Sequence, residues 1–464
     1  MIGVKAKWVL PVGNETPLSV IEDGMVVFDR LSGRIVFVGP HASYPGFVEE
    51  LLCLEGEQLL MPGLINMHSH SPMSLLRGYS EDLPLKQWLE QVWSAEHTFV
   101  DEDFVKVGTS LSIYEMIKTG TTTFCDNYFK STTSLAIARD AGVRIAGGEA
   151  LITSPGDDPQ KQVEQLHSIR SAHALFSAGH SDCTSFSILT PHSCYAVSEQ
   201  MLLQIKSLSD TLNVRVNIHL HESTAEVTDY CDTKGETPIG TLERLGLLNE
   251  KLIAAHCVAL TDDDIALLAK RRVNIVTCPR SNLKLASGVC RVAALVTAGV
   301  NVSIGTDGCC SNNSLDLLAD MQLVSLLGKG VGHDASVLTC DEVLQMATIN
   351  GAKALGVDAH LGSIEVGKLC DMISIDFNDL AAQPVIDVKS SVVHTSGKRV
   401  SNVWVGGRLL MKDGVVLSVD VDRAKLKKYR DLIVMHKSTK KSPRHYREMA
   451  ALRKVPINTS EHTG

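Results

Sequence analysis

The chain has 464 residues with a formal net charge of −9, and 44% of its residues are hydrophobic while 21% are charged. The negative charge argues against nucleic acid or an anionic membrane surface as the main partner, and no apolar run approaches the roughly 18 residues of a transmembrane helix. The N-terminus lacks the layout of a signal peptide and the chain has no C-x-x-C pair, so we expect a cytoplasmic protein with reduced thiols and a large core.

The two ends of the chain differ in style from its middle. Residues 1–58 and 362–421 contain short alternating strands and turns, for example at 24–28, 34–39 and 403–407. Segments that share one style and bracket a larger region are expected to pair with each other. We therefore predict one small β-sandwich domain that is built from both chain ends.

Residues 59–361 alternate between short β-branched segments and helical patterns, which indicates parallel βαβ units. The predicted strands are 60–67, 121–125, 143–147, 186–190, 214–219, 252–256, 273–278 and 300–306. The predicted helices include 102–118, 198–212, 262–270 and 315–326. Eight parallel strands, each followed by helical sequence, predict an α/β fold of the (β/α)8 TIM barrel type. The sequence lacks the glycine fingerprint of an open, doubly wound sheet.

Residues 422–464 form a basic C-terminal tail, with lysine and arginine residues spread from Arg423 to Lys454. A segment of this kind is typical of a solvated helix with a partly disordered end, which is our expectation here. Binding of phosphate or RNA by the tail is the alternative that its charge leaves open.

Histidine and acidic residues stand at the C-terminal ends of five predicted strands, where the chemistry of such barrels gathers. His68 and His70 end the first strand, and their i, i+2 spacing places both side chains on one face of it. The other strand ends carry His192, His219 with Glu222, His256 and Asp307. A single histidine of this type is usually a hydrogen-bonded core residue, whereas the same feature on five strands predicts one shared site.

The residue types at these strand ends suit a divalent metal. His68, His70 and His219 supply nitrogen and Asp307 supplies oxygen, a set that leaves one coordination position open for water. Zinc, iron and nickel all accept three imidazoles and one carboxylate, so the residues alone leave the metal open. A metal of this kind lowers the pKa of bound water to about 7.

Hydrolysis at such a centre also needs groups that move protons. Glu222, three residues after His219, is placed to carry protons between the nucleophile and the substrate. His256 can hydrogen-bond the attacking oxygen, and Asp307 can accept the proton of the water. These three residues are the predicted catalytic groups.

Seven segments occur together in a specific order along residues 1–420: 62–70, 75–79 with 82–85, 118–123, 219–222, 254–257, 278–285 and 305–308. They resemble the amidohydrolase superfamily and, within it, the 5-methylthioadenosine/S-adenosylhomocysteine deaminases. The resemblance implies the barrel and the small β domain. It also implies one divalent metal per subunit, usually zinc, bound by His68, His70, His219 and Asp307, and a homo-oligomer as a possible state.

The same resemblance implies how the substrate is held. In that family the residues that match Glu222 and His256 are catalytic, and those that match Glu96 and His192 contact the nucleoside. Trp88 resembles an aromatic residue that lines the pocket, and Glu222 is also expected to touch the substrate. The stretch from Trp88 to Glu96 is one residue shorter than the family pattern.

A second departure concerns specificity. Members that accept S-adenosylhomocysteine carry arginines after the third strand for its carboxylate, whereas here the first such position is Glu149 and no arginine occurs between Arg144 and Arg170. A bidentate clamp for a carboxylate is therefore missing, although Lys161 offers a single charge. We expect methylthioadenosine or adenosine to be preferred over S-adenosylhomocysteine.

Three functions compete on the sequence. The first is hydrolytic deamination of an adenine nucleoside, which uses a metal, water and a glutamate that is not a ligand, as on another fold. The second is hydrolysis of guanine, cytosine or a triazine by the same apparatus, because fold and metal do not settle the substrate. Relatives that expel chloride can lack the glutamate, so Glu222 favours deamination. The third is a scaffold protein without a metal, which predicts lost ligands, and none is lost.

Overall fold

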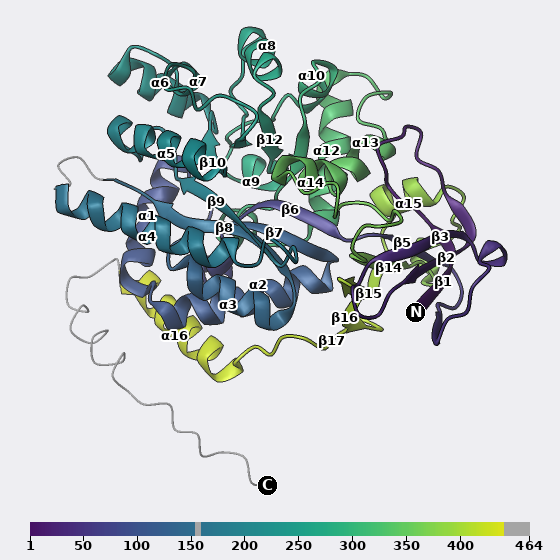
Figure 1. The fold of residues 1–464 in the computed structure, drawn as a ribbon. Coiled ribbons are helices and arrows are strands. Elements are labelled where there is room, and N and C mark those ends of the chain that lie inside the picture. Colours follow the sequence, from purple (N-terminus) through teal and green to yellow (C-terminus); the bar gives the residue numbers. More distant parts are fainter. Residues whose placement is uncertain (154–158, 440–464) are drawn as a thin grey trace, which may run out of the picture.

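The computed structural model describes residues 1–153 and 159–439. Within them, a barrel of strands and helices lies beside a sheet that both chain ends build (Figure 1). No helix in these ranges is long and apolar enough to cross a membrane. The predicted architecture of a (β/α)8 barrel with a small β domain from both ends is confirmed.

Eight parallel strands follow one another around the barrel in chain order, and helices cover the ring from outside (Figure 1). The strands are β6 (Leu64–Ser69), β7 (Thr121–Tyr128), β8 (Arg144–Leu151), β9 (Ser185–Pro191), β10 (Arg215–Leu220), β11 (Leu252–His256), β12 (Asn274–Thr277) and β13 (Val302–Ile304). The last strand meets the first through a few hydrogen bonds rather than a ladder, one of them from the Thr306 amide to the Asn66 side-chain oxygen at 3.0 Å. The Asp307 amide donates to the His68 carbonyl at 2.9 Å, and the Asn66 side chain donates to the Thr306 hydroxyl at 2.7 Å.

The predicted first strand, residues 60–67, is wrong in one respect because the chain divides it between two sheets. Its first part belongs to β5 (Gln58–Pro62) in the sheet of the chain ends, and its second part to β6. Gly63 stands between them, where a Cβ atom would come within 2.2 Å of Thr122. An apolar run that continues through both strands carries no local sign of this change of sheet.

Local signals explain why the predicted helices form where they do. Asp101 caps the first turn of the helix that was predicted at 102–118, with its carboxylate accepting from the Phe104 amide at 2.8 Å. The larger helices are α1 (Leu85–Phe99), α2 (Glu102–Lys118), α3 (Ser131–Ala141), α4 (Pro159–Ser177), α5 (Glu199–Leu212), α6 (Thr224–Lys234), α8 (Asp262–Lys270) and α12 (Leu317–Gly332). Shorter helices are α7 (Pro238–Arg244), α9 (Pro279–Lys284), α10 (Val292–Thr297), α11 (Cys309–Asn312), α13 (Cys340–Met346), α14 (Ile349–Leu355), α15 (Val388–His394), η1 (His41–Ser43), η2 (Ser71–Leu76) and η3 (Leu380–Ala382).

The two chain ends pair into one hydrogen-bonded sheet. β5 joins them, since it runs parallel to β1 on one side and antiparallel to β14 on the other. The strands are β1 (Ile2–Val9), β2 (Ile21–Phe28), β3 (Ile35–Pro40), β4 (Glu50–Cys53), β5, β14 (Met372–Asp376), β15 (Arg399–Val405), β16 (Arg408–Lys412) and β17 (Val415–Val416). The predicted domain boundaries at residues 58, 361 and 421 stay predictions.

The charge pattern of the tail predicts a solvated helix, but the C-terminal helix α16 (Arg423–Thr439) is partly buried. It buries Tyr429, Leu432 and Ile433 in an apolar cluster that also contains Trp88 and Phe99 of α1. The Tyr429 hydroxyl donates to Asp101 at 3.1 Å. One face of the basic tail therefore supports α1, while residues 440–464 lie outside the described residues.

Candidate active site

The two histidines of the first barrel strand lie where its pairing with β7 becomes irregular. Ile65 and Met67 of β6 pack in one apolar cluster with Cys125 and with α14, where a Cβ at Gly351 would touch both side chains. The register of β6 against β7 then shifts between Asn66 and Ser69, and in this stretch the His68 ring lies against the rings of His70 and His219. His70 lies two residues further on, past the end of β6, and faces the same way.

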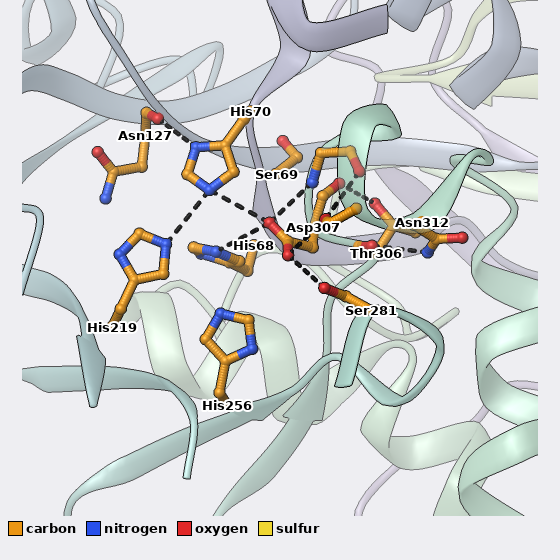
Figure 2. Close-up of polar contacts among 12 residues, drawn as sticks. His68, Ser69, His70, Asn127, His219, His256, Ser281, Thr306, Asp307 and Asn312 are labelled. Atoms are coloured by element: carbon orange, nitrogen blue, oxygen red, sulfur yellow. Dashed lines mark hydrogen bonds and ion pairs between the residues drawn. The ribbon is translucent and has the colours of Figure 1, made fainter. Parts of the chain in front are cut away.

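Backbone carbonyls orient the rings of His70 and His219. Nδ1 of His70 donates to the Asn127 carbonyl at 2.6 Å (Figure 2), and Nδ1 of His219 donates to the His192 carbonyl at 2.7 Å. Each ring then directs its Nε2 toward the other, and the two Nε2 atoms are 3.2 Å apart. A carbonyl that fixes the tautomer in this way is the usual arrangement behind a metal-binding imidazole.

Asp307 presents one carboxylate oxygen to these histidines and anchors the other (Figure 2). Its Oδ1 lies 3.2 Å from His70 Nε2 and 3.6 Å from His68 Nε2. Its Oδ2 accepts from the hydroxyls of Ser281 at 2.6 Å and Ser311 at 2.7 Å. Burial opposes ionisation, but the neighbouring imidazoles of His68 and His70 hold the pKa of Asp307 well below its ordinary range. The carboxylate is therefore charged and held in place.

The cluster fits a divalent cation. His68, His70 and His219 offer ligand atoms that lie within 4.8 Å of one another, and so do His68, His256 and Asp307. Burial lowers the pKa of His68 to about 4, so its ring is neutral, and neither of its nitrogens has a hydrogen-bond partner in the described chain. Buried imidazole nitrogens that face one another and a buried carboxylate are costly unless a cation binds them.

His256 comes close enough to be a ligand as well as a catalytic group. Its Nδ1 donates to the Asn282 side-chain oxygen at 2.9 Å, which leaves Nε2 for the cluster. The backbone of His256 and Asp307 is left-handed, with φ of 72° and 63°. Such conformations cost roughly 1–3 kcal/mol each for residues other than glycine and gather at functional sites.

A pocket with about 590 Å³ of empty volume, including its part open to solvent, opens above the cluster. All four predicted substrate contacts line it together with four residues of the cluster: Trp88, Glu96, His192, Glu222, His70, His219, His256 and Asp307. The structure thus brings every predicted site residue to one place, with His68 just beneath the pocket.

Two acidic side chains in the pocket have altered ionisation because they are buried. Burial raises the pKa of Glu222, and it raises the pKa of Glu96 to about 7. Glu96 and Trp88 lie on the same face of α1, and each is only 6% exposed. Glu96 Oε1 and Trp88 Nε1 have no hydrogen-bond partner in the described chain. These polar atoms are available to a ligand.

Sequence reasoning missed several pocket residues, and one further histidine near the fifth strand end lies outside the site. Asn127, Tyr128 and Phe129 line the pocket because β7 continues three residues past its predicted end at Cys125. Polar residues directly after an apolar strand are the signal that could have found the first two. His221 donates from Nδ1 to the Ala259 carbonyl at 2.8 Å and accepts from the Ile239 amide, so it is a structural residue.

Glu149, which stands at the first position of the expected carboxylate clamp, does not face the pocket. Its carboxylate accepts from the amides of Lys130 at 2.8 Å and Ser131 at 3.0 Å, and from the Ser131 hydroxyl. It therefore caps the N-terminus of α3. Among the described residues that line the pocket, none is a lysine or an arginine, so Lys161 is not part of the lining.

Comparisons with known proteins agree with this geometry. A family model described as "Amidohydrolase family" matches residues 59–410, which is most of the chain. The chain belongs to the amidohydrolase family. This amidohydrolase is 40% identical over 416 residues to a protein of Teredinibacter turnerae named 5-methylthioadenosine/S-adenosylhomocysteine deaminase, with 88% of this chain and 91% of the relative covered.

Two further matches involve other named nucleosides. A protein of Methanopyrus kandleri named 5'-deoxyadenosine deaminase is 35% identical, over 87% of this amidohydrolase and 93% of the relative. A crystal structure of an adenosine deaminase from Xanthomonas campestris with bound zinc is 36% identical and superposes with a TM-score of 0.88, covering 94% of this chain and 98% of that one.

Proposed function

We propose that this amidohydrolase is a metal-dependent hydrolytic deaminase of adenine nucleosides, which releases ammonia and gives the inosine-type product. The single observation that carries the proposal is the convergence of residues from five strand ends on one pocket that already holds Glu222. Relatives of similar length named as deaminases of methylthioadenosine and 5'-deoxyadenosine support it.

We propose that His68, His70, His219 and Asp307 hold one divalent metal, with His256 beside them. The donor set of imidazoles and one carboxylate suits zinc, and the zinc-containing relative from Xanthomonas campestris supports that choice over iron or nickel. A metal held there supplies Lewis acidity, which brings the ionisation of water to near neutral pH. Elemental analysis of the purified protein tests the metal, and stoichiometric iron or nickel would replace zinc in the proposal.

Glu222 is the proposed proton carrier. It lines the pocket beside His256, and burial raises its pKa, so it holds and releases a proton closer to neutral pH than an exposed glutamate does. A carrier at this position takes a proton as water attacks C6 of the adenine ring and delivers it to the leaving nitrogen. His256 donates a hydrogen bond toward the reacting oxygen once Asn282 has fixed its ring.

The substrate preference follows from the pocket wall. The described lining near α1 and the ends of β7 and β8 contains the apolar residues Leu85, Leu89, Phe129 and Ile152 and no lysine or arginine. Burying a carboxylate without a partner costs several kcal/mol. The 5'-methylthio group of methylthioadenosine suits this wall, whereas the amino-acid part of S-adenosylhomocysteine does not.

Ammonia release from adenosine, methylthioadenosine, S-adenosylhomocysteine, guanine and cytosine tests both parts of the proposal. We expect methylthioadenosine or adenosine to exceed S-adenosylhomocysteine in kcat/KM by at least about tenfold, or about 1.4 kcal/mol. A higher value for S-adenosylhomocysteine would contradict the specificity but leave the deaminase assignment. Turnover of guanine or cytosine alone would contradict the assignment itself.

A further inference from the structure

Asn127 is a pocket residue that the proposed reaction does not yet use. It is only 2% exposed, and its side-chain Nδ2 has no hydrogen-bond partner in the described chain. A buried amide without a partner costs roughly 1–3 kcal/mol, so its retention calls for an explanation. It lines the pocket together with the histidine cluster.

Strand alternation shows that this side chain projects into the barrel. Phe124 of β7 belongs to the apolar cluster that contains Ile113 of α2 and Leu135 of α3, so it points outward to the helices. Because successive residues of a strand point to opposite faces, Cys125 and Asn127 face the barrel interior. Figure 2 shows the Asn127 amide beside the His70 ring, on the side away from Asp307.

The backbone and the side chain of Asn127 have separate tasks. The backbone carbonyl accepts from His70 Nδ1 at 2.6 Å, and any residue at position 127 can keep that bond. The side-chain amide contributes nothing to the orientation of His70. Its Nδ2 donor and Oδ1 acceptor lie in the pocket beside the cluster and suit a ligand that offers one acceptor and one donor.

Adenine offers such a pair at its imidazole side, because N7 accepts a hydrogen bond while the adjacent amino group donates one, and asparagine pairs with both. N1 and N7 lie on opposite sides of C6. Glu222 follows β10 and Asn127 lies at the end of β7, with β8 and β9 between them in the ring, so the two residues flank the centre from different sides. A ring with N1 toward Glu222 therefore turns N7 toward Asn127.

We propose that Asn127 is a substrate-binding residue that recognises N7 and the amino group of the adenine ring. This inference rests on the proposed deaminase function and specifies which edge of the adenine ring the enzyme recognises. Nδ2 donates to N7, and Oδ1 accepts from the amino group before it leaves. The residue thereby sets the orientation of the ring over the cluster.

The test compares adenosine with 7-deazaadenosine, in which a C–H group replaces N7. In the Asn127→Leu variant, we expect kcat/KM for adenosine to fall by roughly tenfold or more, and the value for 7-deazaadenosine, which keeps only the contact between its amino group and Oδ1, to fall by a smaller factor. Asn127→Asp keeps the acceptor and loses the donor, so it should show the same selective loss. Bound metal should stay at the wild-type level in both variants, since the carbonyl that holds His70 is retained.

Phe129→Leu is the matched control, because Phe129 lines the same wall without a polar group and its loss should affect both substrates by the same factor. An equal fall for both substrates in the Asn127 variants, or no fall in either, would overturn the role of Asn127. If the wild-type enzyme released no ammonia from adenosine or methylthioadenosine, the proposed function would fail instead, and this inference would fall with it.

Discussion

The pocket has two ends that are built in different ways. At the metal-binding end, His70, His219 and His256 each donate a hydrogen bond to a fixed oxygen, and two hydroxyls hold Asp307. At the nucleoside-binding end, on α1, Trp88 Nε1 and Glu96 Oε1 are buried without partners in the described chain. The comparison teaches that the fold orients the histidine and aspartate cluster, while it leaves polar atoms on α1 without partners in the described chain.

The largest effect should follow from removing a ligand at the metal-binding end. Asp307→Ala or His68→Ala should abolish both bound metal and turnover, since each removes one member of a small ligand set. Elemental analysis and ammonia release measure the two losses. His221→Gln is the matched histidine control, because His221 bonds only to backbone groups and its loss should leave the metal in place. A His68 or Asp307 variant with stoichiometric metal would remove that residue from the ligand set.

The next effect separates proton transfer from metal binding at the same end. Glu222→Gln keeps the size of the side chain but cannot carry a proton, so kcat should fall by roughly 10²-fold or more. Metal content should be unchanged, as measured on the same sample. Loss of metal in this variant would make Glu222 a ligand instead of a proton carrier.

A smaller effect is expected at the nucleoside-binding end. An ionised Glu96 accepts hydrogen bonds from substrate hydroxyls, so Glu96→Gln should raise KM for adenosine by about tenfold, with little change in kcat or metal. Dideoxyadenosine, which lacks the ribose 2'- and 3'-hydroxyls, is the control substrate and should not respond to the change. An equal response for both substrates would place Glu96 away from the ribose.

The pH dependence sharpens the same point. Burial raises the pKa of Glu96 to about 7, so its carboxyl is neutral below that pH and a carboxylate above it. In the wild-type enzyme, kcat/KM should therefore fall as pH drops through about 7, and Glu96→Gln should remove this limb of the profile. A limb that persists unchanged in the variant would assign it to another group.

The smallest effect concerns Glu149, which lies near the pocket but belongs to neither end. Glu149→Gln weakens the cap on α3 and should lower the free energy of unfolding by about 1 kcal/mol, with unchanged specificity. Glu149→Arg should destabilise more, because it places a positive charge at a helix N-terminus. Denaturant unfolding measures both. A gain in S-adenosylhomocysteine turnover by Glu149→Arg would show that the side chain can reach the pocket.

The sequence by itself determined the barrel and the convergence of polar residues at its strand ends, because both are encoded in local patterns. Helical apolar patterns predicted α2 and α8 at their observed bounds, and histidines at strand ends had to meet because parallel strands end on one face. Only the tertiary structure decided what depends on distant partners. It divided the apolar run at Gly63 between two sheets, turned Glu149 toward α3, and packed α16 against α1. It also left the Asn127 Nδ2 atom without a hydrogen-bond partner in the described chain, because the groups around a buried side chain come from distant parts of the sequence.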